Sequence, residues 1–149
     1  MTVAGPPAEA RTAFPAAVHH VALTVSDLGA SRAWYRRLLG TDPIIDEDVA
    51  RLTGHHEGFH HTIFMLTGGV ILALHAHTGS DPAHRFDEFR PGLDHLGFTC
   101  TDRADLERLR TRLDELGIEH GGIADDHLGH GLSFRDPDNI ALEFWAPRS

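Results

Sequence analysis

The feature that most constrains the fold of this chain is an internal repeat. The segment His20-Val-Ala-Leu-Thr-Val-Ser-Asp27 is matched by His95-Leu-Gly-Phe-Thr-Cys-Thr-Asp102, at a constant offset of 75 residues. Solenoid repeats are much shorter, typically about 20–45 residues. The sequence therefore predicts one module that is present twice, and not an array of many short units.

Each matched segment is followed by a helical pattern. The first helix is expected over about 29–39 and the second over about 103–116, and each ends in a leucine followed by a glycine. Asp27 and Asp102 precede these helices at positions where N-caps belong, together with Ser26 and Thr101. In the first helix the residues expected to face inward are Trp34, Leu38 and Leu39.

Three strand-like runs follow each helix, at about 43–46, 61–66 and 70–76 in the first half and about 119–122, 132–135 and 140–145 in the second. Each half thus reads β-α-β-β-β. The predicted organisation is a loose tail over 1–17, a first module over 18–77, a linker over 78–91 and a second module over 92–147.

Composition excludes several classes of function. A net charge of −9 argues against a surface for nucleic acid or anionic lipid, and no run approaches the roughly 18 apolar residues of a membrane span. The chain has no lysine, which excludes Schiff-base and P-loop lysine chemistry. No secretory signal is visible, and the single cysteine, Cys100, cannot form an internal disulfide, so we expect a cytoplasmic protein.

Thirteen histidines make metal or proton chemistry the first function to test. Because side chains alternate along a strand, His20 shares its face with Ala22, His95 shares its face with Gly97, and Glu143 opposes the apolar face of the last strand. Small neighbours leave room around these three side chains. An opening lined by two histidines and a carboxylate suits a divalent metal with free coordination positions.

Three segments together resemble a known group of proteins: His20-Val-Ala-Leu-Thr-Val-Ser-Asp-Leu28, Gly92-Leu-Asp-His95-Leu-Gly-Phe98 and Phe134-Arg-Asp-Pro-Asp-Asn-Ile-Ala-Leu-Glu143-Phe144. The pattern is similar to the vicinal oxygen chelate superfamily, which holds glyoxalase I, methylmalonyl-CoA epimerase, extradiol dioxygenases, fosfomycin-resistance transferases and bleomycin-resistance proteins. The resemblance covers about residues 18–147.

The resemblance implies an α+β, glyoxalase-like fold in which two tandem β-α-β-β-β modules with curled sheets form a metal-binding cleft. It implies that His20, His95 and Glu143 bind a divalent ion, which can be Fe²⁺, Mn²⁺, Ni²⁺ or Zn²⁺. These are the residues that strand alternation selects. It also implies a homodimer whose sheets meet across the subunit boundary.

Departures from the family pattern bear on the activity. In glyoxalase I and the epimerase, the last strand of the first module supplies a fourth ligand. The equivalent position in this sequence is Ala73, which cannot coordinate a metal. His75, on the same strand face, or His77 could substitute for it. Ser133 stands where fosfomycin transferases and extradiol dioxygenases commonly carry a tyrosine, which disfavours both activities.

The sequence therefore predicts a metal-dependent enzyme of the glyoxalase type, a lyase or isomerase, acting on a small substrate that chelates through two adjacent oxygens. The metal would act as a Lewis acid that stabilises an enolate or oxyanion, and a nearby base would move the proton. The candidate bases are His75 first, then His61, His77 and Glu57.

Two alternatives remain open at this point. Two histidines and one carboxylate also suit an Fe²⁺ dioxygenase of the extradiol type. The other alternative is a non-catalytic protein that binds an antibiotic or metabolite, as bleomycin-resistance proteins do. Aromatic residues available to stack on such a ligand are Trp34, Trp145, Phe59 and Phe64.

Two further surface expectations follow from spacing. Charged residues recur at positions three and four apart on the second helix, which is typical of a solvated helix face; they are Arg103, Glu107, Arg110 and Asp114. His55, His56 and His60 fall near Gly54 and Gly58, and we expect them to be solvated in a loop.

Overall fold

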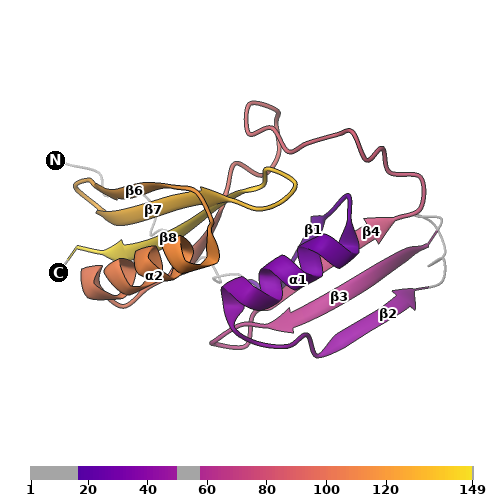
Figure 1. Ribbon diagram of the computed structural model, residues 1–149, viewed down its shortest axis with the longest axis horizontal. Helices are drawn as coiled ribbons and strands as arrows, with labels where there is room; N and C mark the ends of the chain where they lie inside the picture. The colour runs from indigo at the N-terminus through magenta and orange to yellow at the C-terminus, as the bar shows by residue number, and fades with distance from the viewer. Residues whose placement is uncertain (1–16, 50–57, 149) are drawn as a thin grey trace, which may run out of the picture.

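The computed structural model describes residues 17–49 and 58–148, and in these ranges the chain forms the two predicted β-α-β-β-β modules (Figure 1). The first module contains β1 (His20–Thr24), α1 (Leu28–Leu39), β2 (Ile45–Val49), β3 (Phe59–Met65) and β4 (Ile71–His77). The second contains β5 (Leu96–Thr99), α2 (Arg103–Leu116), β6 (His120–Asp125), β7 (Gly129–Arg135) and β8 (Ala141–Pro147). Residues 1–16 of the predicted tail lie outside the described residues, as do Glu57, His55 and His56.

Within the described ranges the strands form two four-stranded sheets, with the orders β1-β4-β3-β2 and β5-β8-β7-β6. In each sheet the first strand pairs with the last strand in parallel, and the other pairs are antiparallel. Helix α1 packs on β3 and β4, α2 packs on β6, β7 and β8, and the two helices contact each other. The segment between β4 and β5 arches over the top of the view and joins the modules (Figure 1).

Both helices begin and end where the sequence predicts, to within one residue. The Asp27 carboxylate accepts a hydrogen bond from the backbone N–H of Ala30, and the Asp102 carboxylate accepts one from Asp105, each at 2.9 Å. Gly40 ends α1 with a φ of 67°, a left-handed conformation that costs glycine little. The repeat therefore extends to the capping of the helices.

The buried side of α1 differs from the expectation. Tyr35 is completely buried, whereas Trp34, predicted to face inward, is only partly buried. Helix α1 has to pack on its own sheet and on the second module at once, and the ring of Trp34 lies 6.3 Å from that of Phe134 in β7. The inward stripe is therefore wider than the spacing of the apolar residues indicates.

A buried polar junction joins the second module to α1 and to the residues just before this helix. The Tyr35 hydroxyl donates to Asp136 at 2.9 Å, and Asp136 also accepts the backbone N–H groups of Asp138 and Ile140 at 2.8 Å. The Asp138 carboxylate accepts both the backbone N–H and the hydroxyl of Ser26. Burial is the main reason that the pKa values of Tyr35 and Asp136 are raised. The Asp-Pro-Asp turn therefore has a structural role, because its two carboxylates connect the second module to the first.

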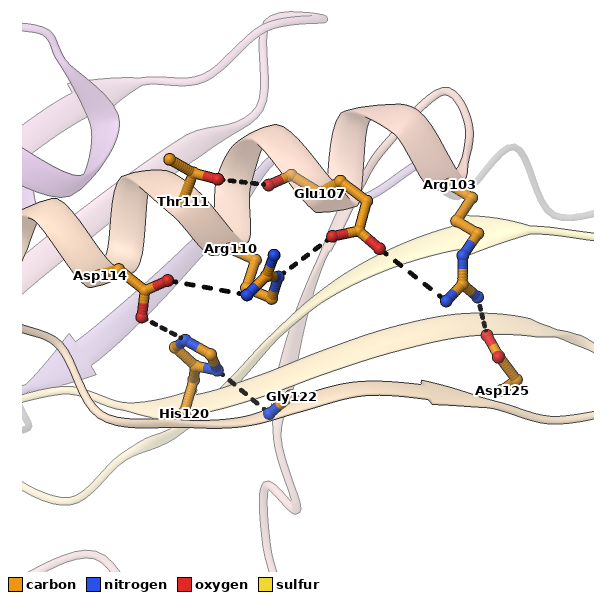
Figure 2. Close-up of polar contacts among 8 residues, drawn as sticks. All are labelled: Arg103, Glu107, Arg110, Thr111, Asp114, His120, Gly122 and Asp125. Carbon is orange, nitrogen blue, oxygen red and sulfur yellow. Dashed lines mark hydrogen bonds and ion pairs between the residues drawn. The ribbon is translucent and has the colours of Figure 1, made fainter.

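The exposed face of α2 carries a continuous row of ion pairs (Figure 2). Arg103 pairs with Glu107, Arg110 lies 3.1 Å from Glu107, and Asp114 follows at 3.8 Å from Arg110. The side chains are about half exposed, as expected for a solvated face. Both ends of the row contact β6: Arg103 pairs with Asp125, and Asp114 pairs with His120. Each exposed pair contributes little by itself, but together they tie α2 to the edge of its sheet.

The expectation for His60 was wrong, because His60 lies inside β3. Its ring lies between two carboxylates of the neighbouring strand β2, Asp46 at 2.9 Å and Asp48 at 2.7 Å. The Asp46 carboxylate also pairs with Arg32 of α1. The hydrogen bond to Asp46 is the main reason that the pKa of His60 is raised. His60 is a structural side chain on the helix side of the first sheet.

Candidate metal centre

His95 and Glu143 come together on the second sheet, on the face that α2 does not cover. Glu143 lies in β8, opposite Gly97 of β5 and Ser133 of β7, and His95 immediately precedes β5. The distance from Nε2 of His95 to Oε2 of Glu143 is 3.6 Å. Two ligands with bonds of about 2.1 Å and an angle of about 90–120° at the metal lie about 3.0–3.6 Å apart. The pair therefore fits two adjacent coordination positions of one ion.

Two glycines border the carboxylate. Gly131 of β7 is buried, and a Cβ at this position would collide with the Glu143 carboxylate. Gly97 faces open space, with nothing within 4 Å of an added Cβ. Gly97 was selected from the sequence but Gly131 was not, because the predicted strand-like run began only at residue 132, whereas β7 begins at Gly129. The carboxylate sits where it does because Gly131 has no side chain.

Asp94 orients the His95 ring from the other side. Its carboxylate lies 2.6 Å from Nδ1 of His95 and accepts the proton of the Nδ1–H tautomer. That tautomer leaves the Nε2 lone pair, on the side of Glu143, free to bind a metal. A carboxylate behind a ligating histidine is a recurring arrangement in metal sites. Asp94 was not among the residues predicted from the sequence, although it directly precedes His95.

A cavity of about 240 Å³ borders the pair. Its polar lining residues are Glu88, Asp94, His95, Ser133, Arg135 and Glu143. The Arg135 guanidinium binds both oxygens of Glu88, at 3.0 and 2.5 Å, and these hydrogen bonds lower the pKa of Glu88 to about 2. Three carboxylates against one guanidinium leave the lining net negative, which favours a cation.

His20, the third predicted ligand, lies on the other sheet. It begins the edge strand β1, and its Nδ1 lies 3.0 Å from Nδ1 of His19. In residues 17–49 and 58–148, no three His, Cys, Asp or Glu side chains gather closely enough to hold a metal. One chain therefore brings together two of the three predicted ligands.

The described candidate bases lie on the face of the first sheet opposite α1, where they form one cluster. His61 of β3 is directly opposite His75 of β4, and their ring centroids are 5.8 Å apart. The Phe59 ring stacks on His75 at 4.4 Å, and His77 lies 5.9 Å from His75. His61 also lies 3.2 Å from the Glu47 carboxylate. Glu57, the fourth candidate, lies outside the described residues.

Strand register relates this cluster to His20. Thr24 pairs with His75 and Ala22 pairs with Ala73, so the cluster shares a sheet face with His20. Of the aromatic residues considered for stacking, Phe59 belongs to this face, whereas Phe64 is completely buried in the core. The structure therefore presents one histidine-rich face and one His–Glu pair, on separate sheets.

Neither α1 nor α2 is long and apolar enough to serve as a membrane span.

Comparison with known proteins gives consistent matches. Residues 17–144 match the Glyoxalase/Bleomycin resistance protein/Dioxygenase superfamily. An uncharacterized protein of Bacillus subtilis, YwkD, is 32% identical over 133 residues, which cover 86% of this chain and 94% of that protein. A glyoxylase/bleomycin resistance protein/dioxygenase domain from Frankia is 38% identical, with a TM-score of 0.70, and the match covers 90% of this chain and 93% of that chain.

A second structure shares the fold at low sequence identity. A mutant of the fosfomycin resistance protein FosX of Listeria monocytogenes, complexed with Mn(II) and 1S,2S-dihydroxypropylphosphonic acid, is 16% identical with a TM-score of 0.64. The match covers 91% of this chain and 95% of that chain. The predicted α+β, glyoxalase-like fold is confirmed by these structural matches.

Proposed function

Because the chain belongs to the Glyoxalase/Bleomycin resistance protein/Dioxygenase superfamily, we propose that it is a divalent-metal-dependent enzyme acting on a small, oxygen-chelating substrate. The observation that carries this proposal is the His95–Glu143 pair, 3.6 Å apart beside a net negative cavity. The Mn(II) complex of the Listeria protein supports a divalent ion in this fold. We place the enzyme in the cytoplasm.

The third ligand, His20, comes from a second copy of the chain in this proposal. His20, Ala22 and Thr24 line the edge strand β1, and His95 and Gly97 are exposed along the other edge strand β5. An edge strand with small exposed side chains can approach another sheet closely. In a homodimer with twofold symmetry, each copy would give His20 to one site and His95 with Glu143 to the other.

When bound, the metal would supply Lewis-acid stabilisation of negative charge on the substrate oxygens. The chain itself supplies a base for proton transfer, and His75 is the first candidate. Its ring stacks on the Phe59 ring, and it lies on the sheet face of His20. His61, oriented by Glu47, is the second candidate, followed by His77. This arrangement supports a lyase or isomerase, and the alternative, an extradiol-type dioxygenase, would use Fe²⁺.

The metal content of the purified protein tests the proposal. Wild-type protein is purified without an affinity tag or chelator and compared with Glu143→Gln by mass spectrometry of metals. We expect about one divalent ion per chain in the wild type and a clear loss in the variant. Glu115→Gln is a matched control, since Glu115 is exposed on α2 and pairs with Arg112. Equal metal content in all three proteins would contradict the assignment, and no metal after Mn²⁺ addition would favour a ligand-sequestering protein.

A mixing experiment tests whether the site is shared. His20→Ala and His95→Ala should each lose metal binding. If the ligands come from two copies, co-refolding the two variants restores part of the binding, because a mixed dimer contains one site with all three ligands intact. If all ligands came from one chain, the mixture would bind no more metal than the separate variants.

A further inference from the structure

The linker between the modules is fastened to the turn that precedes Glu143. Residues 86–95, here called the strap, cross from that turn to the start of β5. The backbone N–H of Phe86 donates to the carbonyl of Asp138 at 3.0 Å, and the Asn139 side-chain amide donates to the carbonyl of Phe86 at 3.0 Å. Farther along, Glu88 is bound by the Arg135 guanidinium through two hydrogen bonds.

We propose that Arg135 is a positioning residue that holds the strap and thereby places His95 against Glu143. This inference rests on the proposed metal site for its function, but the contacts that carry it are independent of any metal. Arg135 and Glu143 lie on adjacent strands of one sheet, with Arg135 opposite Ala141 and Ser133 opposite Glu143. The guanidinium is therefore mounted on the same rigid element as the carboxylate.

His95 depends on the strap more than Glu143 does. Residue 96 is the first of β5 and pairs with β8, so only the C-terminal side of His95 is fixed by the sheet. On its other side stands Asp94, a side chain 77% exposed, whose carboxylate orients the His95 ring at 2.6 Å. Phe86 fixes the beginning of the strap at the turn, and the two hydrogen bonds of Glu88 fix its middle to the sheet, closer to Asp94. Loss of those contacts frees Asp94 and the ring that it orients.

Charge and donor geometry explain why an arginine suits this position better than a lysine. Glu88, Asp94 and Glu143 all line one cavity, and three carboxylates repel one another. The Arg135 guanidinium faces two of them: Glu88 through its hydrogen bonds, and Asp94 through a longer-range attraction. A guanidinium offers two parallel donors to a carboxylate, whereas a lysine offers a single point of charge.

The strap also offers a matched control. Arg90 lies on the strap itself and pairs with Asp87 three residues earlier, at 3.2 Å, with its side chain 78% exposed. That pair is local to the strap, so Arg90→Gln removes the same charge without releasing the strap from the sheet. Arg135→Gln removes the link to the sheet, and Arg135→Lys keeps the charge but loses the second hydrogen bond.

The first measurement needs no metal. Amide hydrogen exchange over residues 88–95 is compared among the wild type and the three arginine variants, and thermal unfolding checks that each remains folded. We expect faster exchange in the strap for Arg135→Gln, a partial effect for Arg135→Lys and no change for Arg90→Gln. In NMR spectra, the Glu143→Gln substitution alone should shift the signal of the His95 ring. In a protein that already carries Arg135→Gln, adding Glu143→Gln should no longer shift this signal.

The second measurement is the affinity for Mn²⁺ by titration calorimetry. Arg135→Gln should weaken binding by about tenfold or more, the range found when groups that orient metal ligands are removed. Unchanged strap exchange and an unchanged His95 response in Arg135→Gln would overturn the inference, as would an equal effect of Arg90→Gln. If the wild type binds no Mn²⁺, the proposed function fails, and the exchange and NMR results alone decide the role of Arg135.

Discussion

Substitution of Tyr35 by phenylalanine isolates the buried junction between the modules. The change keeps the ring, which is completely buried, and removes only the hydroxyl that donates to Asp136 at 2.9 Å. Asp136 is itself only 6% exposed, so water cannot replace the lost donor easily. A hydrogen bond to a charged group contributes about 1.5–3 kcal/mol. We expect Tyr35→Phe to lower the free energy of unfolding by about 2 kcal/mol at pH 7.

The loss should depend on pH in a defined direction. Burial raises the pKa of Asp136 above its unfolded value of about 3.9, so its contribution to stability is greatest below that pH and declines as pH rises through the folded pKa. The Tyr35 hydrogen bond opposes this rise, because it stabilises the charged carboxylate. Removal of the hydroxyl raises the pKa of Asp136 further. The cost of Tyr35→Phe should therefore be larger at about pH 7 than at about pH 4.5.

Urea unfolding measures both the cost of Tyr35→Phe and its dependence on pH. The protein concentration is kept fixed, because association of chains would shift the unfolding midpoint. Thr62→Val is the matched control, because Thr62 is also completely buried and its hydroxyl donates to Asp46 at 2.8 Å. The Asp46 side chain is 32% exposed and has His60 and Arg32 as further partners, so we expect a smaller cost. Equal costs for the two substitutions, or a Tyr35→Phe cost that does not grow with pH, would refute the reasoning.

Three further outcomes follow from the site and from the first sheet. Gly131→Ala should displace the Glu143 carboxylate and lower the metal content, whereas Gly121→Ala on β6, where an added Cβ meets open space, should not; metal analysis of both variants checks this. Addition of Mn²⁺ should raise the Tm of the wild type but not of Glu143→Gln, in a thermal scan. The raised pKa of His60 adds stability below about pH 6.5, which is lost as pH rises through the folded value. His60→Gln should therefore lower the free energy of unfolding more at about pH 6 than at about pH 9. The difference should be less than about 1 kcal/mol, because the pair with Asp46 is partly exposed. Urea unfolding at the two pH values measures it.

The fold could be predicted from the sequence because its information is local and repeated. The offset of 75 residues aligns two N-caps and two strand patterns, and caps and alternation depend on neighbours in the chain. The His95–Glu143 pair follows from the same logic, since both side chains lie on the face opposite the apolar one. Strand alternation thus predicts which face a side chain takes, without knowledge of the rest of the molecule.

The features that sequence reasoning missed depend on contacts between distant segments. The hydroxyl of Tyr35 meets Asp136, 101 residues away, and Glu88 meets Arg135, 47 residues away. Helical spacing shows an apolar stripe but not that a second module covers the adjacent side of the helix. His60 was missed for the same reason, because its partners are on a neighbouring strand and a nearby glycine favoured a loop.

The strand register suggests why the site would need two different modules. Ala22 pairs with Ala73 in the first sheet, as Gly97 pairs with Glu143 in the second, so Ala73 occupies the position equivalent to Glu143. The first module therefore offers one ligand, His20, and the second offers two. First modules paired with each other would give two ligands, and second modules paired with each other would give four. Pairing a first module with a second gives three, which leaves positions on an ion for water and substrate. Ala73→Glu tests this argument: in the proposed dimer it would add a fourth ligand beside His20, and we expect it to tighten Mn²⁺ binding in calorimetry, whereas weaker binding in a folded variant would contradict the proposed pairing.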